Sequence, residues 1–359
     1  MKGIKITRRK FIGTMGMAMA AKSIVPDKGI AAGNPPSSYC IDCQSHIFIP
    51  EIIDLMKRRK EDPSIYEKEG AVWIKMGDWH RKLRPTHMDI EAKLAAMDAN
   101  AINLTALSTN DPGPEWFGEE GAQVALLMNN YIAGITKKYP DRFIGLIVLP
   151  LQDREAAESE LRRCVLNLGM RGILLYTNLA GSWPDEPQYR WLFEAALQYD
   201  LPILLHPAKP TTTEQIKGYN LTSTLGNMFE NTISLARIIA SGLLDDYPDL
   251  KLVCPHLGGT LPYIAGRFDH QVTVLKRSNQ TLNQKPSDYM RQIYFDIVSP
   301  LPEAMRFALD FTSADRLLFS SDHPWVDPAL IRDCLKGLEL KVQDEEKILG
   351  GNARRLFNL

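Results

Sequence analysis

Eight short apolar segments, separated by longer helical patterns, constrain the fold of this chain more than any other feature. They are rich in Ile, Leu and Val and lack the polar alternation of a strand with one solvent-facing side. The segments span residues 39–43, 101–108, 143–150, 172–176, 202–206, 250–256, 292–298 and 316–322. Strands that are buried on both faces and alternate with helices form parallel sheets. Eight such units favour a (β/α)8 barrel over an open doubly wound sheet.

The connections between these segments carry helix signals. Asp153 can cap a helix whose apolar residues recur at helical spacing and which stops at Gly169. No glycine-rich dinucleotide fingerprint follows the first strand, and no phosphate-binding loop motif occurs, so nucleotide binding has no support. Residues 57–87 are charged and contain Trp73 and Trp79. They form a long insertion before the second strand, and we expect it to act as a lid over the barrel mouth.

The first 32 residues resemble an export signal rather than part of the fold. Arg8 and Arg9 precede an apolar stretch at residues 11–21, and small residues follow around Ala31. The stretch is too short to span a bilayer. The segment TRRKFIG resembles the twin-arginine signal, which exports folded proteins. We therefore expect residues 1–32 to be a leader for export to the periplasm and residues 33–359 to form one barrel domain.

Composition excludes several classes of partner. The 359 residues carry a formal net charge of -1 and are 45% hydrophobic. This balance favours neither nucleic acid nor a membrane surface and is typical of a globular protein that binds a small-molecule substrate. The five cysteines are an odd number without a metal-ligand pattern, and we expect them to be mostly small buried residues.

Polar residues collect where the predicted strands end. Gln44 and His46 end the first strand, and Asp42 shares their two-residue spacing, so all three are expected on one face. Three further strands end in polar residues, which are His206, His256 and Asp322. In a (β/α)8 barrel these carboxyl ends meet at one mouth, where active sites lie. Imidazole and carboxylate groups suit zinc, manganese or iron. A lone histidine at a strand end is more often structural, but their joint placement predicts a site.

Several motifs resemble one known family. The segments IDCQSHIFIP, YPDRFIGLIVLP, LPILLHP, HLGGTLPYIAGRFD, LLFSSDHPW and ILGGNARRLF occur in this order between residues 41 and 357. They resemble the amidohydrolase-related barrels, in the branch of aminocarboxymuconate-semialdehyde decarboxylase and the resorcylate-type decarboxylases. The resemblance implies a homodimeric barrel enzyme with one divalent metal ion. Zinc is the expected ion, with manganese and iron as alternatives.

The resemblance also implies roles for individual residues. It makes His46, His206 and Asp322 metal ligands, with His256 and Asp322 as the catalytic residues. The family's first strand-one histidine falls on Gln44, whose neutral amide is a poorer ligand for such metals. Gln44 could coordinate weakly, stand aside from a three-ligand site, or mark a centre that has lost its metal.

The sequence leaves the reaction open. Hydrolysis would use Asp322 to take a proton from water, and non-oxidative decarboxylation would use Asp322 and His256 to protonate the substrate carbon. A second hypothesis is a metal-free or degenerate barrel that serves as a periplasmic small-molecule binding protein. A carboxylated substrate needs a basic partner, for which Lys209 is best placed, with Arg81 and Arg84 as second choices.

Overall fold

The computed structural model describes residues 39–359, which lie within one compact unit, Ser37–Leu359. Its main sheet has eight parallel strands in the order β1-β5-β6-β7-β8-β9-β10-β11. The strands are β1 (Ile41–Ile47), β5 (Leu104–Thr109), β6 (Phe143–Ile147), β7 (Gly172–Tyr176), β8 (Ile203–His206), β9 (Leu252–Cys254), β10 (Tyr294–Asp296) and β11 (Leu317–Leu318). Each predicted apolar segment overlaps one of them, so the predicted (β/α)8 barrel is confirmed.

Backbone hydrogen bonds join the first strand to the segment that follows the last one. Cys43 N donates to Phe319 O at 3.0 Å, and Asp322 N donates to Gln44 O at 2.8 Å. We call this contact between β1 and residues 319–323 the seam. The seam closes the ring of strands and places Asp322 beside the end of β1.

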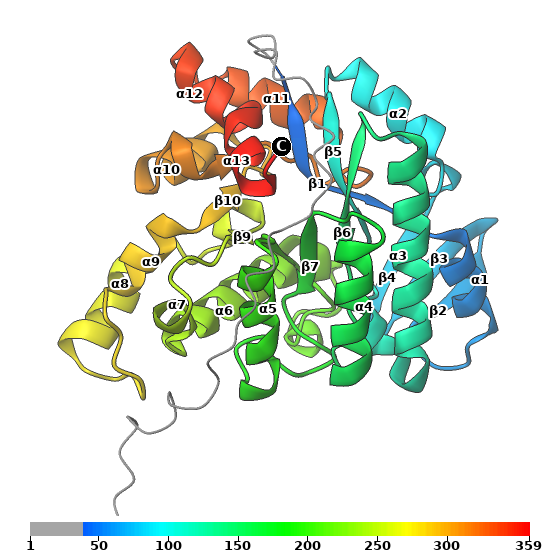
Figure 1. Cartoon of the computed structure of the whole chain (residues 1–359), viewed down its shortest axis with the longest axis horizontal. Coiled ribbons are helices and arrows are strands. Elements are labelled where there is room, and N and C mark those ends of the chain that lie inside the picture. Colours follow the sequence, from blue (N-terminus) through cyan, green and yellow to red (C-terminus); the bar gives the residue numbers. More distant parts are fainter. Residues whose placement is uncertain (1–38) are drawn as a thin grey trace, which may run out of the picture. The chain divides into compact units, whose positions relative to one another are not determined.

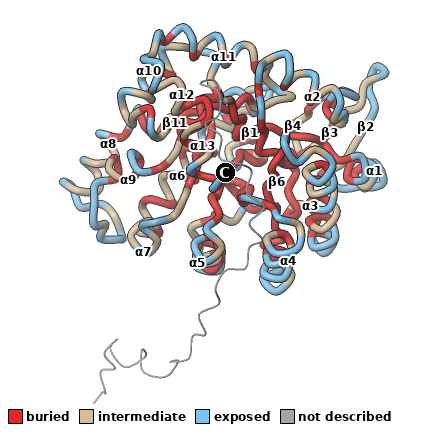
Figure 2. Tube along the Cα trace, turned by 45° about the horizontal axis from the view of Figure 1, so that its top comes forward, coloured by how far each residue is buried: buried red, intermediate tan, exposed pale blue. Residues whose placement is uncertain are grey.

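Helices surround the strands (Figure 1). They are α1 (Pro50–Arg58), α2 (Ile90–Ala99), α3 (Gly121–Lys138), α4 (Arg154–Leu166), α5 (Arg190–Gln198), α6 (Asn227–Ala240), α7 (Leu243–Asp246), α8 (Ala265–Asp269), α9 (Pro286–Gln292), α10 (Pro302–Phe311), α11 (Pro328–Lys336), α12 (Val342–Glu346) and α13 (Asn352–Phe357). The strands are buried, whereas the outer helices bury the side that faces them, as Figure 2 shows. The predicted Asp153 cap is present, because its carboxylate accepts from Ala156 N at 3.1 Å.

The insertion after the first strand has a fold of its own. It is an antiparallel sheet of β2 (Ser64–Lys68), β3 (Ala71–Met76) and β4 (Trp79–Leu83). Its last strand reaches the loops at the barrel mouth, since Trp79 Nε1 donates to Ser223 Oγ at 3.0 Å. That it acts as a lid remains a prediction.

The inside of the barrel is filled by side chains. The cavity left below the mouth, among Leu146, Leu174 and Leu204, holds about 10 Å3. The barrel is therefore a packed core rather than a channel, and its chemistry must lie at the mouth.

Two further predictions concern the chain as a whole. All five cysteines are free thiols, and four of them are buried, as expected. Among residues 39–359 no helix has the length and apolar character that crossing a bilayer requires. The predicted export signal, residues 1–32, lies outside the described residues.

Candidate metal centre

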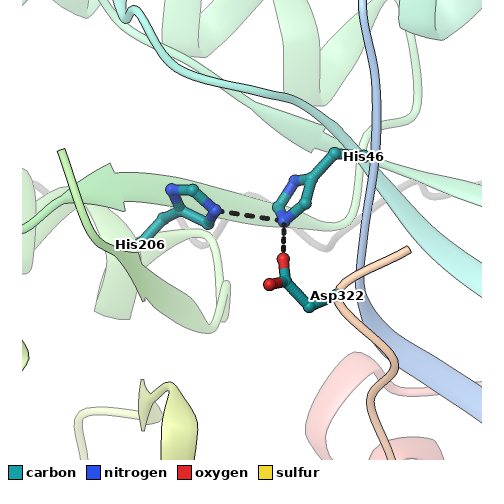
Figure 3. A group of neighbouring side chains, drawn as sticks. All are labelled: His46, His206 and Asp322. Atoms are coloured by element: carbon teal, nitrogen blue, oxygen red, sulfur yellow. Dashed lines mark hydrogen bonds and ion pairs between the residues drawn. The ribbon is translucent and has the colours of Figure 1, made fainter. Parts of the chain in front are cut away.

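Two histidines from strands on different sides of the barrel meet at its mouth. His46 lies near the end of β1 and His206 is the last residue of β8. Their Nε2 atoms are 3.1 Å apart, and the two rings stand nearly perpendicular, with centroids 4.4 Å apart. Both side chains are buried, so neither ring is free to turn toward solvent. Figure 3 shows the two nitrogen atoms facing each other.

Asp322 joins the two histidines from the seam. Its Oδ1 lies 3.2 Å from His46 Nε2, and one possible ligand atom from each of the three residues lies within 4.8 Å of the others. The backbone of Asp322 is left-handed, with φ 57°, a strained conformation for a residue other than glycine. The predicted ligands His46, His206 and Asp322 therefore do lie together.

The surroundings of His46 prepare it as a ligand. Its Nδ1 lies 2.7 Å from Ser108 Oγ, and this hydroxyl can accept a hydrogen bond from Nδ1 when the Nε2 lone pair binds a metal. Histidine ligands are commonly oriented through their other ring nitrogen in this way. Two imidazoles and one carboxylate are also a common donor set for a catalytic divalent metal. The residues therefore fit such an ion.

Gln44 lies beside this group. Its Nε2 is 3.5 Å from Asp322 Oδ1, which is the outer limit of a hydrogen bond. Its Oε1 is buried and has no hydrogen-bond partner within residues 39–359. Gln44 thus offers one free acceptor oxygen next to the other three residues, while the donor set of two histidines and one aspartate does not depend on it.

His256 faces the other carboxylate oxygen of Asp322 than the one near His46. Its Nε2 is 3.7 Å from Asp322 Oδ2, and its backbone is also left-handed, with φ 54°. Asp296 Oδ1 accepts from the backbone N of His256 at 2.7 Å, and Asn231 Nδ2 lies 3.0 Å from Nδ1. These contacts hold the ring so that Nε2 points at the Asp322 carboxylate.

Burial and neighbouring charges set the pKa values of this group. Burial opposes ionisation of Asp322, but hydrogen bonds from His256 and His46 outweigh it and hold the pKa of this carboxyl well below its usual range. Burial also opposes a charge on His256, yet the Asp322 carboxylate raises the pKa of that imidazole. Burial, together with the nearby His46, lowers the pKa of His206 well below its usual value. The neutral state suits His206 as a ligand.

Asp42 does not share the face of Gln44 and His46, so this expectation was wrong. Its carboxylate accepts from Ser321 N at 2.9 Å and from Ser321 Oγ at 2.5 Å. The register of β1 against β5 shifts between Asp42 and Ser45. An irregularity of this kind interrupts the two-residue alternation of a strand. Asp42 therefore holds the seam rather than the metal centre.

The basic residues expected near the mouth differ in burial. Arg81 of β4 is buried, and its Nη1 donates to Asp111 Oδ1 at 2.6 Å and to Asn110 Oδ1 at 2.9 Å. Lys209 is partly exposed, and its Nζ lies over the Trp116 ring at 5.9 Å from the centroid. Arg84 is exposed. Of these three positively charged side chains, Arg81 is the most buried.

Sequence reasoning missed a buried lysine at the seam. Lys93 of α2 donates to Ser45 Oγ at 2.7 Å, and its Nζ lies 2.8 Å from His323 Nδ1. Burial lowers the pKa of Lys93 to about 7. In the sequence it is one charged residue in a short helix, where such residues usually face solvent. Through these two contacts Lys93 links β1 to His323, the residue that follows Asp322.

Comparison with known sequences gives two consistent results. Residues 41–359 match the family described as Amidohydrolase. The γ-resorcylate decarboxylase of Rhizobium sp. (strain MTP-10005) is 32% identical over 299 residues, which cover 79% of this chain and 91% of that protein. The 2-amino-3-carboxymuconate-6-semialdehyde decarboxylase of Dictyostelium discoideum is 26% identical over 324 residues, covering 84% and 89% of the two chains.

Solved structures show the same fold. The dihydroxybenzoic acid decarboxylase of Polaromonas sp. JS666, with bound manganese and the inhibitor 2-nitroresorcinol, superimposes with a TM-score of 0.77 at 28% identity. The match covers 90% of this chain and 97% of that one. The 5-carboxyvanillate decarboxylase LigW of Sphingomonas paucimobilis gives a TM-score of 0.80 at 23% identity over 90% of this chain and 99% of that one, which is evidence for the fold alone.

Proposed function

We propose that this chain, which belongs to the amidohydrolase family, is a non-oxidative decarboxylase of a small carboxylated aromatic acid. It is a metal-dependent enzyme of that family, so the alternative of a binding protein without turnover is not favoured. One observation carries the choice of reaction, which is the 32% identity to the γ-resorcylate decarboxylase. Two groups that can move a proton, His256 and Asp322, lie directly beside the metal-ligand group, with their nearest atoms 3.7 Å apart.

The reaction replaces a carboxylate by a proton on the same ring carbon. A divalent metal, when bound by His46, His206 and Asp322, would supply positive charge that draws in an anionic substrate. In our proposal a proton on His256 Nε2, which faces Asp322 Oδ2, is delivered to the ring carbon, and a pair of ring π electrons forms the new C–H bond. The bond between that carbon and the carboxylate then breaks, carbon dioxide leaves, and the electron pair of the broken bond returns to the ring and restores its aromaticity.

Hydrolysis is the other reaction considered from the sequence. The same His256 and Asp322 could take a proton from water, so the geometry of these two residues does not separate the reactions. Similarity to the γ-resorcylate decarboxylase, at 32% identity, supports decarboxylation.

The metal is the second part of the proposal. Zinc suits two imidazoles and a carboxylate, and so does manganese, which the Polaromonas structure contains. We propose one divalent ion, zinc or manganese, in each chain. The substrate's carboxylate needs a positive partner besides the metal, and Lys209 is our candidate, because the charge of Arg81 is already paired with Asp111.

Export and assembly complete the proposal. We propose that residues 1–32 direct the protein to the periplasm by the twin-arginine route and that residues 33–359 form the mature barrel, as a homodimer. Replacing both Arg8 and Arg9 by lysine should leave the protein in the cytoplasm after cell fractionation. Light scattering of the purified protein should give twice the mass of one mature chain, and a monomer mass would contradict the dimer.

A panel of acids and esters tests the reaction. The purified protein, loaded with zinc or manganese, is offered hydroxybenzoates, muconate-like acids and lactones, and carbon dioxide release is measured beside ring opening. We expect release of carbon dioxide from at least one hydroxybenzoate, and Asp322→Asn or His256→Gln should lower the rate by about 10^2–10^4. His270→Ala, which changes an exposed histidine, should keep the rate. Ring opening of lactones without carbon dioxide release would refute the proposal.

A further inference from the structure

The ammonium group of Lys209 lies at the barrel mouth without a carboxylate partner. Lys209 follows His206, the last residue of β8, by three positions. Within residues 39–359 its Nζ forms neither an ion pair nor a hydrogen bond. The side chain is partly exposed, so an anion can reach it from solvent without a preformed cavity. The positive charge of Lys209 is therefore available to a ligand.

The insertion after β1 limits where this charge can lie. Gly77 stands in the turn between β3 and β4, and a Cβ atom placed on it would lie only 2.6 Å from Lys209 Nζ. The ammonium therefore occupies the space that the missing side chain leaves. The turn is itself anchored, because Gly77 N donates to Asp62 Oδ2 at 2.5 Å. The ring of Trp116 also lies within cation–π distance, with its centroid 5.9 Å from Nζ.

A buried glutamate fixes the backbone of the same lysine. Glu230 of α6 is fully buried, and its Oε1 accepts from Thr211 N and Thr211 Oγ1, both at 2.6 Å. Its Oε2 accepts from Asn178 Nδ2 at 2.9 Å, and the same Nδ2 donates to Lys209 O at 3.0 Å. Burying a carboxylate is costly unless it is paired or hydrogen-bonded. Glu230 is satisfied by these bonds, and together they hold the chain at residues 209 and 211.

A structural lysine is the other interpretation of these contacts. Such a residue would direct its ammonium at a carboxylate or at backbone carbonyl groups, as Lys251 does with Asp200 at 2.6 Å. Lys209 has no such acceptor within residues 39–359, although its backbone and its charged end are both restrained. Fixing a charged group before a ligand arrives reduces the conformational entropy that is lost on binding. The restraints on Lys209 therefore favour a role in anion binding.

We propose that Gly77 and Glu230 are positioning residues for Lys209 and that they place its ammonium where it binds the carboxylate of the substrate. The inference rests on the proposed function, which makes Lys209 the positive partner of that carboxylate. Gly77 contributes the space for the ammonium, and Glu230 fixes the backbone from which the side chain extends. The insertion thus takes part in substrate binding through a glycine rather than through a charged side chain.

Two matched glycine variants test the role of Gly77. Gly77→Ala adds a Cβ atom at Lys209 Nζ, whereas Gly70→Ala adds one where no atom lies within 4 Å. The φ angles of the two glycines are 62° and 70°, so the backbone strain is alike. Calorimetry on the metal-loaded protein measures the affinity for benzoate and for the neutral benzamide. Gly77→Ala should weaken benzoate binding by about tenfold and leave benzamide binding unchanged, while Gly70→Ala should change neither.

Variants of the lysine and the glutamate complete the test. Lys209→Met should weaken benzoate binding by about tenfold or more. Adding Gly77→Ala to Lys209→Met should have no further effect, because the two residues act through one ammonium. Glu230→Gln cannot accept hydrogen bonds at both ends, so benzoate binding should weaken by about threefold or more. Lys341→Met and Glu214→Gln, both at exposed positions, are the controls.

Three results would overturn the inference. They are equal wild-type affinity for benzoate and benzamide, unchanged benzoate binding in Lys209→Met, and equal losses in Gly77→Ala and Gly70→Ala. The melting temperature of each variant checks that it is folded. Carbon dioxide release from hydroxybenzoates separates the two proposals. Lost benzoate affinity in Lys209→Met without release from any acid supports the inference and refutes the decarboxylase, whereas release with an unchanged KM in Lys209→Met does the reverse.

Discussion

The Nε2 atoms of His46 and His206 face each other across 3.1 Å, although 160 positions separate the two residues in the chain. His46 is held by Ser108 at its other nitrogen, and His206 Nδ1 has no hydrogen-bond partner within the described residues. Both Nε2 atoms could bind one cation in their unprotonated state, and Asp322 places a carboxylate oxygen 3.2 Å from His46 Nε2.

Removing one imidazole should abolish metal binding. His206→Ala leaves only His46 and Asp322 of the donor set, so we expect its metal content to fall from about one ion per chain to near zero. Because a bound metal stabilises only the folded state, a chelator should lower the melting temperature of the wild type and leave that of the variant unchanged. Metal analysis with a thermal scan measures both. His270→Ala should behave as wild type, and a variant that still holds stoichiometric metal would contradict the assignment.

Ser108 should act on the metal through His46. Its Oγ lies 2.7 Å from His46 Nδ1, and loss of such a partner costs about 10–100-fold in metal affinity. Ser108→Ala should therefore weaken metal binding by that factor while the protein stays folded. Titration with a competing chelator measures the affinity. Ser278→Ala, on a loop away from β1 and β8, should leave it unchanged, and equal affinities for both variants would exclude this role.

Two substitutions of Gln44 separate the roles considered for it. Gln44→Glu adds a negative charge where a free amide oxygen now lies, so metal affinity should rise by about tenfold or more. Gln44→Leu should keep one ion per chain, because His46, His206 and Asp322 provide three ligands without it. Both affinities come from the same chelator titration. Loss of the metal in Gln44→Leu would instead make the amide oxygen an essential ligand.

Glu115 should make the protein less stable as the pH rises. Burial raises its pKa from 4.5 to about 8 in the folded chain. Between these values the folded protein keeps a proton that the unfolded chain has lost, so the free energy of unfolding falls with increasing pH, by about 1.4 kcal/mol per unit. Denaturation at about pH 5 and about pH 8 should show Glu115→Gln gaining stability relative to wild type across this window. Glu214→Gln, at an exposed glutamate, should not, and parallel curves for Glu115→Gln and wild type would contradict a buried acid.

The strand ends could be predicted because two independent signals agree there. His206 follows a continuous apolar run, and the barrel architecture brings the ends of all such runs to one mouth. Asp322 and His256 were found by the same reasoning. Asp42 was misplaced because a one-residue irregularity in β1 changes which side chains point inward, and no residue in IDCQSH marks it.

Other structural features were not predicted from the sequence patterns. Gly77 and the Lys209 ammonium come together only in the folded chain, because theirs is a tertiary contact. The insertion was predicted as a charged segment that could act as a lid, and no strands were assigned to it. Gly70 and Gly77 stand at its two tight turns with positive φ. Glycine between short alternating runs is a hairpin signal and could have been used to find this sheet.

The seam between β1 and residues 319–323 sets the order in which the centre can be assembled. His46 is made early in synthesis and Asp322 among the last residues, and their meeting requires the ring to be complete. A nascent chain that ends before residue 322 contains His46 and His206 but lacks Asp322. The Asp322 carboxylate is the group that contacts both His46 and His256. Chemistry at this mouth therefore begins only once the whole barrel has been made and closed on itself.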